Sequence, residues 1–297
     1  MSPRHLALAV GIAAVWGFNF VVMQTGLRHF APLQYAGLRF ALAAFPALLF
    51  VGRPGVAWRW VAGVAAAIGV GQFGLLLVGM RAGMPAGLSS LVLQTQALFT
   101  VLFAATLLGE RLTARRVTGL AVAFCGLALV AFDFGVSGPI GAFALCVAAA
   151  AAWSVGIIIQ RRAAPPDSLR FMVWVSALST PPLLLMSFLL EGAPTLDAPL
   201  EGWLSLAYVA FISTLGGFGA WGFLLRRYDA STVGPYALLV PVFGMSSAAL
   251  VTGEPLSWPT VLAAALIIAG VLYAGSRPRH RVQQSPERLE STLARRA

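Results

Sequence analysis

Apolar runs of roughly 18 or more residues recur along the whole chain, separated by short gaps rich in Pro, Gly and Arg. A run of this length crosses the ~30 Å hydrocarbon core of a bilayer as a helix. Membrane strands are disfavoured, because barrel strands alternate apolar and polar residues with period two and these runs do not. Charged residues make up only 10% of the sequence, too few to cover a water-facing surface. The sequence therefore predicts an all-α membrane protein.

Breaks at Pro, Gly and Arg clusters divide the chain into ten candidate transmembrane helices. The residues after Ser276 are polar and Arg-rich, and we expect them to form a tail with little fixed structure. No cleavable signal peptide is expected, because the first apolar stretch is long enough to be a span. The predicted limits of the spans are 6–27, 33–51, 58–80, 86–108, 115–132, 139–160, 169–190, 202–225, 232–252 and 257–275.

The arginines predict how the chain is threaded. All 20 Lys and Arg residues are Arg, and in membrane proteins the cytoplasmic loops carry the excess of positive charge. With the N-terminus in the cytoplasm, seventeen arginines fall on that side and only Arg28 and Arg81 on the other. The same distribution requires an even number of spans, so both termini are expected in the cytoplasm. The arginines in the cytoplasmic gaps set the orientation of the chain in the membrane and account for its net charge of +10. This charge therefore does not indicate nucleic-acid binding.

The chain also repeats itself at an offset of 144 residues. GERLT at Gly109–Thr113 matches GEPLS at Gly253–Ser257, and Phe99 matches Phe243. Chance similarity among small and apolar residues is the alternative, but the motif recurs at the same place in two sets of five helices. Five is an odd number, so the second set enters the membrane from the opposite side, as in the inverted repeats of many secondary transporters. The predicted units are a first repeat over 1–135, a second over 136–276 and a polar cytoplasmic tail over 277–297.

Motifs for catalysis and ATP hydrolysis are absent from the sequence. It contains no GxxxxGK[ST], HExxH or GxSxG pattern and no paired carboxylates within a span. His5, His29 and His280 lie at chain ends or in loops, and Cys125 and Cys146 fit no metal or disulfide spacing. We therefore expect no enzyme activity, metal or cofactor. The expected partners are the lipid bilayer and a small-molecule solute, and the oligomeric state is left open.

Arg39 is the only arginine placed well inside a predicted span, four residues after Tyr35 on the same helix face. A central arginine costs about 2.5–3.5 kcal/mol on insertion scales, which makes it a functional-site hypothesis by default. One interpretation is a clamp for a substrate carboxylate. The other is a side chain that snorkels or pairs with helix-end carbonyls, because Arg39 lies only ~10 Å from the outer end of its helix.

Neutral polar and aromatic residues at membrane depth are the other candidates for binding a solute. Amides and hydroxyls within spans need partners, either on neighbouring helices or in a wet cavity. Gln94 and Gln96 cannot share a helix face, so we expect at most one of them to face the solute. For each single residue, helix packing or an interfacial aromatic belt is the alternative. The candidate binding residues are Trp16, Asn19, Phe20, Tyr35, Arg39, Gln72, Gln94, Gln96, Trp153, Trp174 and Tyr236.

Three further residues are candidates for a gating or structural role. Pro241 frees a backbone carbonyl within the ninth predicted span and is a candidate bend. Glu110 and Glu254 occupy equivalent places just after the fourth and ninth spans. For this pair, helix-end capping and a part in coupling or gating are both open.

At these same positions the chain resembles a known family. The segments WGFNFVVMQTGL, AGLRF, GMPAGLSSLVLQTQALFT, GERL and LLVPVFGMSSAAL are similar to the EamA family of the drug/metabolite transporter superfamily. The resemblance extends to about residue 275 and is greatest to bacterial exporters of O-acetylserine and cysteine. It implies ten helices, an inner-membrane location and efflux by alternating access. The second repeat departs from the pattern, because Trp153-Ser154-Val155 stands where the first has WGFNF.

The sequence and the resemblance together predict an inner-membrane secondary transporter that exports small amino-acid-type metabolites, such as O-acetylserine or cysteine. One alternative is the same architecture exporting drugs, sugars or nucleotide derivatives. Another is a membrane interaction protein that transports nothing. Facilitated efflux and proton antiport are both compatible with the sequence.

Overall fold

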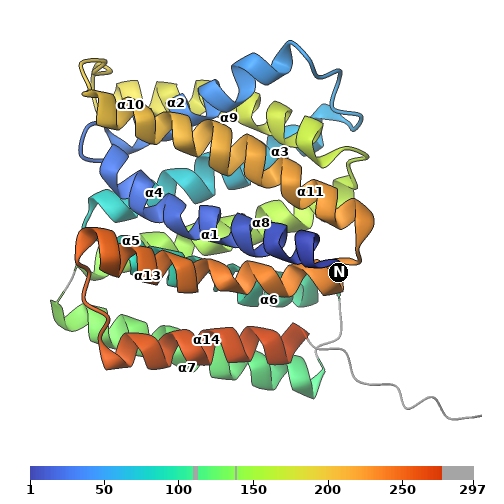
Figure 1. Ribbon diagram of the computed structural model, residues 1–297, viewed down its shortest axis with the longest axis vertical. Coiled ribbons are helices and arrows are strands. Elements are labelled where there is room, and N and C mark those ends of the chain that lie inside the picture. The colour runs from blue at the N-terminus through green and yellow to red at the C-terminus, as the bar shows by residue number, and fades with distance from the viewer. Residues whose placement is uncertain (110–112, 138, 276–297) are drawn as a thin grey trace, which may run out of the picture.

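The computed structural model describes residues 1–109, 113–137 and 139–275, in which every regular element is a helix. The helices lie side by side in layers stacked along the long axis of the molecule (Figure 1). The predicted tail over 277–297 lies outside these residues. The helices in the first part of the chain are α1 Pro3–Gly26, α2 Pro32–Leu48, α3 Trp58–Val64, η1 Ala65–Gly74, α4 Leu75–Arg81, α5 Ala86–Leu93, α6 Gln96–Leu108 and α7 Ala114–Ser137. Those that follow are α8 Ile140–Ala163, α9 Ser168–Leu190, α10 Leu200–Ala207, η2 Tyr208–Gly216, α11 Gly217–Arg227, α12 Ala230–Val233, η3 Gly234–Leu239, α13 Val240–Thr252 and α14 Trp258–Gly275.

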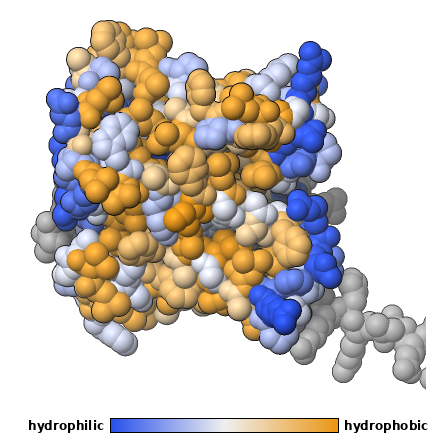
Figure 2. Space-filling model, turned by 45° about the horizontal axis from the view of Figure 1, so that its top comes forward, coloured by the Kyte–Doolittle hydropathy of each residue, from blue (hydrophilic) through white to orange (hydrophobic). Residues whose placement is uncertain are grey.

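The surface and the helix lengths are those of a multi-pass membrane protein. Within the described ranges, eight helical segments are long and apolar enough to cross a bilayer, and Trp258–Ala274 is a shorter apolar helix. Large apolar side chains lie on the outside, with Phe132 75% and Leu250 86% exposed. Figure 2 shows apolar residues across the middle of the molecule and hydrophilic residues at both ends of the helices. Lipid is the environment that such an extended apolar surface requires.

The helices begin and end close to the predicted limits, but several are irregular inside. The predicted span 86–108 is two helices, α5 and α6, separated by a turn at Gln94 and Thr95. The spans 58–80 and 202–225 each contain a π-helical segment, η1 and η2. The ninth span opens with α12 and the 3-10 segment η3. Hydropathy predicts where a helix crosses lipid but does not report the register of its hydrogen bonds, so these breaks were not predicted.

Two glycines at equivalent places in the sequence end two helices in the same way. Gly109 follows α6 and Gly253 follows α13, and each has a φ of 68°. Glycine adopts this left-handed conformation without the steric cost of a Cβ atom, which makes it the usual residue after a helix C-terminus. The match between GERLT and GEPLS therefore coincides with a shared backbone cap.

Close helix–helix contacts rest on small residues. A Cβ atom on Gly17 of α1 would lie 2.7 Å from both the Val240 carbonyl oxygen and the Gly244 amide nitrogen near the start of α13. Gly11, on the same helix, has no such neighbour within 4 Å. The backbones of α1 and α13 thus touch at Gly17, the kind of contact that drives helix association in lipid.

Helices α7 and α14 form a pair at one end of the long axis (Figure 1). A Cβ atom on Gly119 or on Gly270 would lie 2.6 Å from the carbonyl oxygen of the other residue. Gly126 approaches the Ala263 carbonyl oxygen in the same manner, at 2.9 Å. Apart from this pairing, α7 has few contacts with the other elements.

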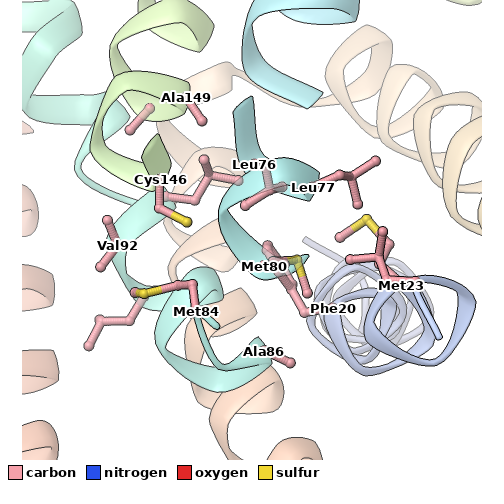
Figure 3. Close-up of a cluster of buried hydrophobic side chains, with 14 of the residues drawn as sticks. Phe20, Met23, Leu76, Leu77, Met80, Met84, Ala86, Val92, Cys146 and Ala149 are labelled. Carbon is pink, nitrogen blue, oxygen red and sulfur yellow. The ribbon is translucent and has the colours of Figure 1, made fainter. Parts of the chain in front are cut away.

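We call the end of the molecule where α1 begins the N-terminal face, and the end where α1 finishes the opposite face. A hydrophobic cluster fills the half nearer the opposite face, between α1, α4, α5 and α8 (Figure 3). Its methionines and aromatic residue are almost fully buried, and tight packing of this kind leaves little room for a solute. The cluster includes Phe20, Met23, Leu76, Leu77, Met80, Met84, Val92 and Cys146.

Candidate substrate-binding site

Arg39 on α2 is a buried cation without a counter-charge. Only 2% of its surface is exposed. Its Nη2 donates to Thr214 Oγ1 at 3.1 Å, and its Nη1 lies 3.8 Å from Met23 Sδ. Its Nε has no hydrogen-bond partner, and no carboxylate of the described residues forms an ion pair with it. Burying an uncompensated charge costs several kcal/mol, so the surrounding fold must hold this guanidinium in place.

Aromatic rings offset part of the cost of burying Arg39. Its guanidinium carbon lies 3.9 Å from the ring centroid of Phe73 and 4.9 Å from that of Phe40. A desolvated cation over an aromatic face gains about 0.5–2 kcal/mol. Among the described residues, the guanidinium has no carbonyl partner at a helix end, and it does not reach the surface. The snorkelling interpretation therefore does not describe this conformation.

Two of the four residues that contact the Arg39 guanidinium belong to the two π-helical segments. Phe73 lies in η1, and Thr214 lies in η2. The Thr214 hydroxyl accepts from Arg39 and donates to the Val209 carbonyl oxygen, five residues earlier, at 2.7 Å. π-helical turns are rare and occur frequently at functional sites. Arg39 thus lies between two irregular segments that come from distant parts of the chain.

The predicted residues of α1 lie on its inner face but have different surroundings. The Trp16 indole Nε1 donates to the Ser213 carbonyl oxygen of η2 at 3.0 Å, and its ring packs on Phe218. Asn19 is 7% exposed, and its Oδ1 has no partner. Phe20 packs in the hydrophobic cluster of Figure 3. Trp16 therefore lies beside η2, whereas Phe20 contributes to the packing of the half nearer the opposite face.

Tyr35 is fully buried and links three helices near the opposite face. Its hydroxyl lies 2.6 Å from Ser205 Oγ on α10, and that Oγ donates to the Val22 carbonyl oxygen on α1 at 2.8 Å. Phe30 packs edge-on against Trp203 beside this group. In this conformation Tyr35 contributes to closure of the opposite face, one helical turn from Arg39.

Gln94 and Gln96 point in different directions, as their spacing predicts. Gln94 lies at the turn between α5 and α6, and its Nε2 donates to the Ala237 carbonyl oxygen of η3 at 3.2 Å. Gln96 Oε1 accepts from Thr100 of its own helix at 3.4 Å. Gln94 therefore connects two interrupted helices, whereas the side chain of Gln96 is engaged within α6.

Three other predicted residues lie nearer the N-terminal face. Trp153 packs on the core beside Ser154, whose hydroxyl donates to the Gln96 carbonyl oxygen at 2.7 Å. Tyr236 lies in η3 and packs against a cluster that includes Ala9 and Ile12 of α1. Trp174 lies apart from Arg39, where its Nε1 donates to the Gly52 carbonyl oxygen and its ring packs on Trp58. The position of Trp174 at the helix ends is the one that an interfacial aromatic belt predicts.

Pro241 lies in the first turn of α13, directly after the 3-10 segment η3, within the apolar helical segment Gly234–Thr252. Its part in a bend for gating stays a prediction. A proline in the first helical turn has no amide hydrogen to leave unpaired, and its fixed φ suits the start of a helix. The irregularity in this span lies before Pro241, in the 3-10 turns of η3.

Glu254 caps a helix from a distant part of the chain. Its two carboxylate oxygens accept from the amide nitrogens of Ala86 and Gly87, at 2.8 and 2.9 Å. These are the first residues of α5, where amides lack partners within the helix. This geometry corresponds to the capping interpretation. Glu110 lies outside the described residues.

Glu191, which was not predicted, makes the same kind of cap on α2. Its carboxylate oxygens accept from the amide nitrogens of Leu33 and Gln34, at 2.8 and 3.1 Å. The Ser187 hydroxyl donates to the same carboxylate at 2.8 Å. Both caps lie at the opposite face, and each one ties the end of a later helix to the start of an earlier one.

Replacing Glu254 with glutamine is expected to lower the free energy of unfolding by about 1–2 kcal/mol, because a neutral amide offers one oxygen acceptor in place of two. Thermal unfolding of the purified protein in detergent measures this change. Glu201→Gln is the matched control, since the Glu201 side chain is 60% exposed and its ion pair with His29 is long, at 3.6 Å. Equal unfolding temperatures for the two variants would contradict the capping role.

Four residues contact the Arg39 guanidinium and were missed by reasoning from the sequence: Thr214, Met23, Phe73 and Phe40. Thr214 could have been found, because Ser213 and Thr214 form a polar pair inside an otherwise apolar run. Met23 shares a predicted face with Trp16 but looks like any core methionine. Phe73 carries no sequence signal that separates it from the other phenylalanines, because its role depends on the tertiary position of η1.

Two surface pockets of the described residues lie away from Arg39. One surface pocket, of about 460 Å³, is lined by Leu225–Asp229 and Thr232 at the N-terminal face. Another, of about 210 Å³, lies between α2 and α9. Neither includes Arg39. Nearly every residue of α5 is buried, whereas α6 is mostly half-buried or exposed, so packing is tightest toward the opposite face.

A multi-pass helical fold with a buried cation that has no ion pair among the described residues favours a membrane transporter. The sequence matches the EamA-like transporter family twice, over residues 4–132 and 139–275. This chain belongs to that family. A crystal structure with 20% sequence identity shares the fold, with a TM-score of 0.64 over 93% of this chain and 97% of the other.

Several relatives are named as exporters. The chain is 42% identical over 283 residues to a probable amino-acid metabolite efflux pump of Salmonella typhimurium, covering 91% of this chain and 94% of the relative. It is 40% identical to a protein of the same name from Escherichia coli, with the same coverage. A probable terminal-alkyne amino-acid exporter of Streptantibioticus cattleyicolor is 27% identical over 97% of this chain and 99% of its own length.

Proposed function

We propose that this protein exports small amino-acid-type metabolites, such as O-acetylserine or cysteine, by alternating access, and that Arg39 binds the substrate carboxylate. The observation that carries the proposal is the buried guanidinium without a counter-charge. A carboxylate supplies that charge and accepts charge-assisted hydrogen bonds in a fixed geometry. The names of the relatives support the same substrate class.

An inverted repeat of two five-helix units, over 1–135 and 136–276, is part of the proposal. Three correspondences support it. The π-helical segments η1 and η2 interrupt the third span of the first and second unit, respectively. The fourth span is broken in its middle in the first unit and near its start in the second. The helix caps at Gly109 and Gly253 match. In such repeats the substrate site lies between the units, where helices are interrupted. Arg39, between η1 and η2, occupies that place.

We place the protein in the inner membrane with both termini in the cytoplasm, so that the N-terminal face is cytoplasmic. The distribution of arginines supports this orientation. The test introduces single cysteines at Gly52 or Gly192 in a cysteine-free background and labels intact cells with an impermeant maleimide. Labelling of position 52 without labelling of position 192 would overturn the orientation.

Transport is tested with purified protein in liposomes loaded with labelled O-acetylserine or cysteine. Release above that from protein-free liposomes is expected for amino-acid probes and not for a sugar or a cationic dye. Adding a pH gradient separates proton antiport from facilitated efflux, since a coupled transporter responds to it and a facilitator does not. Release of the dye or sugar without release of any amino-acid probe would overturn the proposed substrate class.

A further inference from the structure

Six buried side-chain nitrogen or oxygen atoms of the described residues lack a hydrogen-bond partner. Three of them are Arg39 Nε, Asn19 Oδ1 and Gln72 Oε1. These residues come from three different helices, and each is less than a tenth exposed. Buried polar atoms are paired in most proteins, so unpaired atoms on neighbouring helices require an explanation.

Asn19 and Gln72 each lie within one helical turn of a residue that contacts Arg39. Asn19 lies one helical turn before Met23 on α1, and Met23 Sδ contacts the Arg39 guanidinium at 3.8 Å. Gln72 directly precedes Phe73 in η1, and the Phe73 ring centroid lies 3.9 Å from the Arg39 guanidinium carbon. Each amide is therefore close along its helix to a residue that contacts Arg39, one on α1 and one on η1.

The unpaired atoms match the two ends of an α-amino acid. Arg39 Nε is a donor and suits a carboxylate, whereas Asn19 Oδ1 and Gln72 Oε1 are acceptors and suit an ammonium group. On the basis of the proposed function, we infer that Asn19 and Gln72 form an ammonium subsite beside Arg39. The transporter then recognises both charges of a zwitterionic α-amino acid, with the free amino group as a requirement for binding.

Neutral oxygens have an advantage over a carboxylate in this subsite. A carboxylate placed close to Arg39 would pair with it in the empty transporter, because opposite charges attract strongly in a medium of low polarity. The guanidinium would then no longer be available to the substrate. Amide oxygens accept from an ammonium group without cancelling the charge of Arg39, so the two subsites can act together.

The first test uses the unmodified protein in liposomes with three probes that differ in one charged group. O-acetyl-L-serine carries both groups, 3-acetoxypropanoate lacks the ammonium, and O-acetylethanolamine lacks the carboxylate. We expect kcat/KM for O-acetylserine to exceed that for each of the other two by about tenfold or more. N-acetyl-L-serine, an isomer whose nitrogen is acylated, is expected to compete as poorly as 3-acetoxypropanoate.

The second test uses the double variant Asn19→Leu, Gln72→Met, which keeps a similar side-chain shape and removes the acceptors. KM for O-acetylserine is expected to rise by about tenfold, while transport of 3-acetoxypropanoate stays within about twofold of the unmodified protein. A loss that is equal for both probes would overturn the subsite. The comparison among probes on the unmodified protein decides the matter if the variant does not fold.

The outcomes separate this inference from the function on which it rests. If the unmodified protein transports O-acetylserine and 3-acetoxypropanoate equally well, the ammonium subsite is wrong and the carboxylate role of Arg39 stands. If it transports no carboxylate probe, the proposed function fails and the subsite fails with it. Preference for O-acetylethanolamine over O-acetylserine would overturn both.

Discussion

Arg39→Gln is expected to lower efflux of a carboxylate-bearing probe by about 10- to 100-fold. Hydrogen bonds to charged groups contribute about 1.5–3 kcal/mol, and 1.4 kcal/mol corresponds to a factor of ten. Glutamine can still bond the Thr214 hydroxyl but cannot neutralise a carboxylate in a region of low polarity. The measurement is the initial rate of release from loaded liposomes at several probe concentrations.

Loss of transport in Arg39→Gln is expected without loss of stability. The substitution removes a buried cation that has no counter-charge in this conformation, so the unfolding temperature is expected to stay the same or rise. Arg59→Gln is the matched control, since Arg59 is exposed beside Trp60 at the N-terminal face and its loss removes the same charge from the chain. Normal transport by Arg39→Gln, or equal loss in both variants, would show that Arg39 does not bind the substrate.

Gly17→Leu is expected to destabilise the fold by about 2 kcal/mol or more, because overpacking of a close contact forces the backbones apart. A Cβ atom at this position meets the main chain of α13, at Val240 and Gly244, and main-chain atoms cannot rotate away. The same change at Gly11 adds a side chain where no neighbour lies within 4 Å, so Gly11→Leu is the control. Thermal unfolding in detergent and the yield of monodisperse protein measure the difference.

The comparison between these two glycines isolates the helix contact from the chemistry of the substitution. Both residues lie on α1, both become leucine, and leucine is a better helix former than glycine. Any difference in stability therefore reports the contact with α13. If Gly11→Leu and Gly17→Leu unfold at the same temperature, the close approach of α1 and α13 does not contribute to stability as the structure indicates.

The helices could be predicted from the sequence because a bilayer imposes a simple requirement on the length and polarity of each helix that crosses it. A span needs a certain length of apolar residues, and Arg39 was conspicuous because a charge within such a run is costly. The family and the transporter class followed from the same segments and are confirmed by the two matches to the EamA-like family. These features depend on local composition, which a single sequence displays directly.

The details of the site depend on tertiary structure and could not be predicted. Phe73, which contacts Arg39, lies in the π-helical segment η1, and apolar periodicity does not reveal a π-helical register. Trp174 is an aromatic residue of the type expected in a substrate-binding site, but it lies at the helix ends. The 3-10 turns of η3 that precede Pro241 likewise have no signal in the sequence.

The pairing of α7 with α14 has a consequence for biogenesis. α7 is made well before α14, which spans Trp258–Gly275, so its glycine face at Gly119 and Gly126 meets lipid until the end of synthesis. A chain that stops before residue 258 would leave this face permanently without its partner. The last helix therefore completes the packing of α7. Truncated products without it are expected to be degraded by membrane quality control as unassembled proteins.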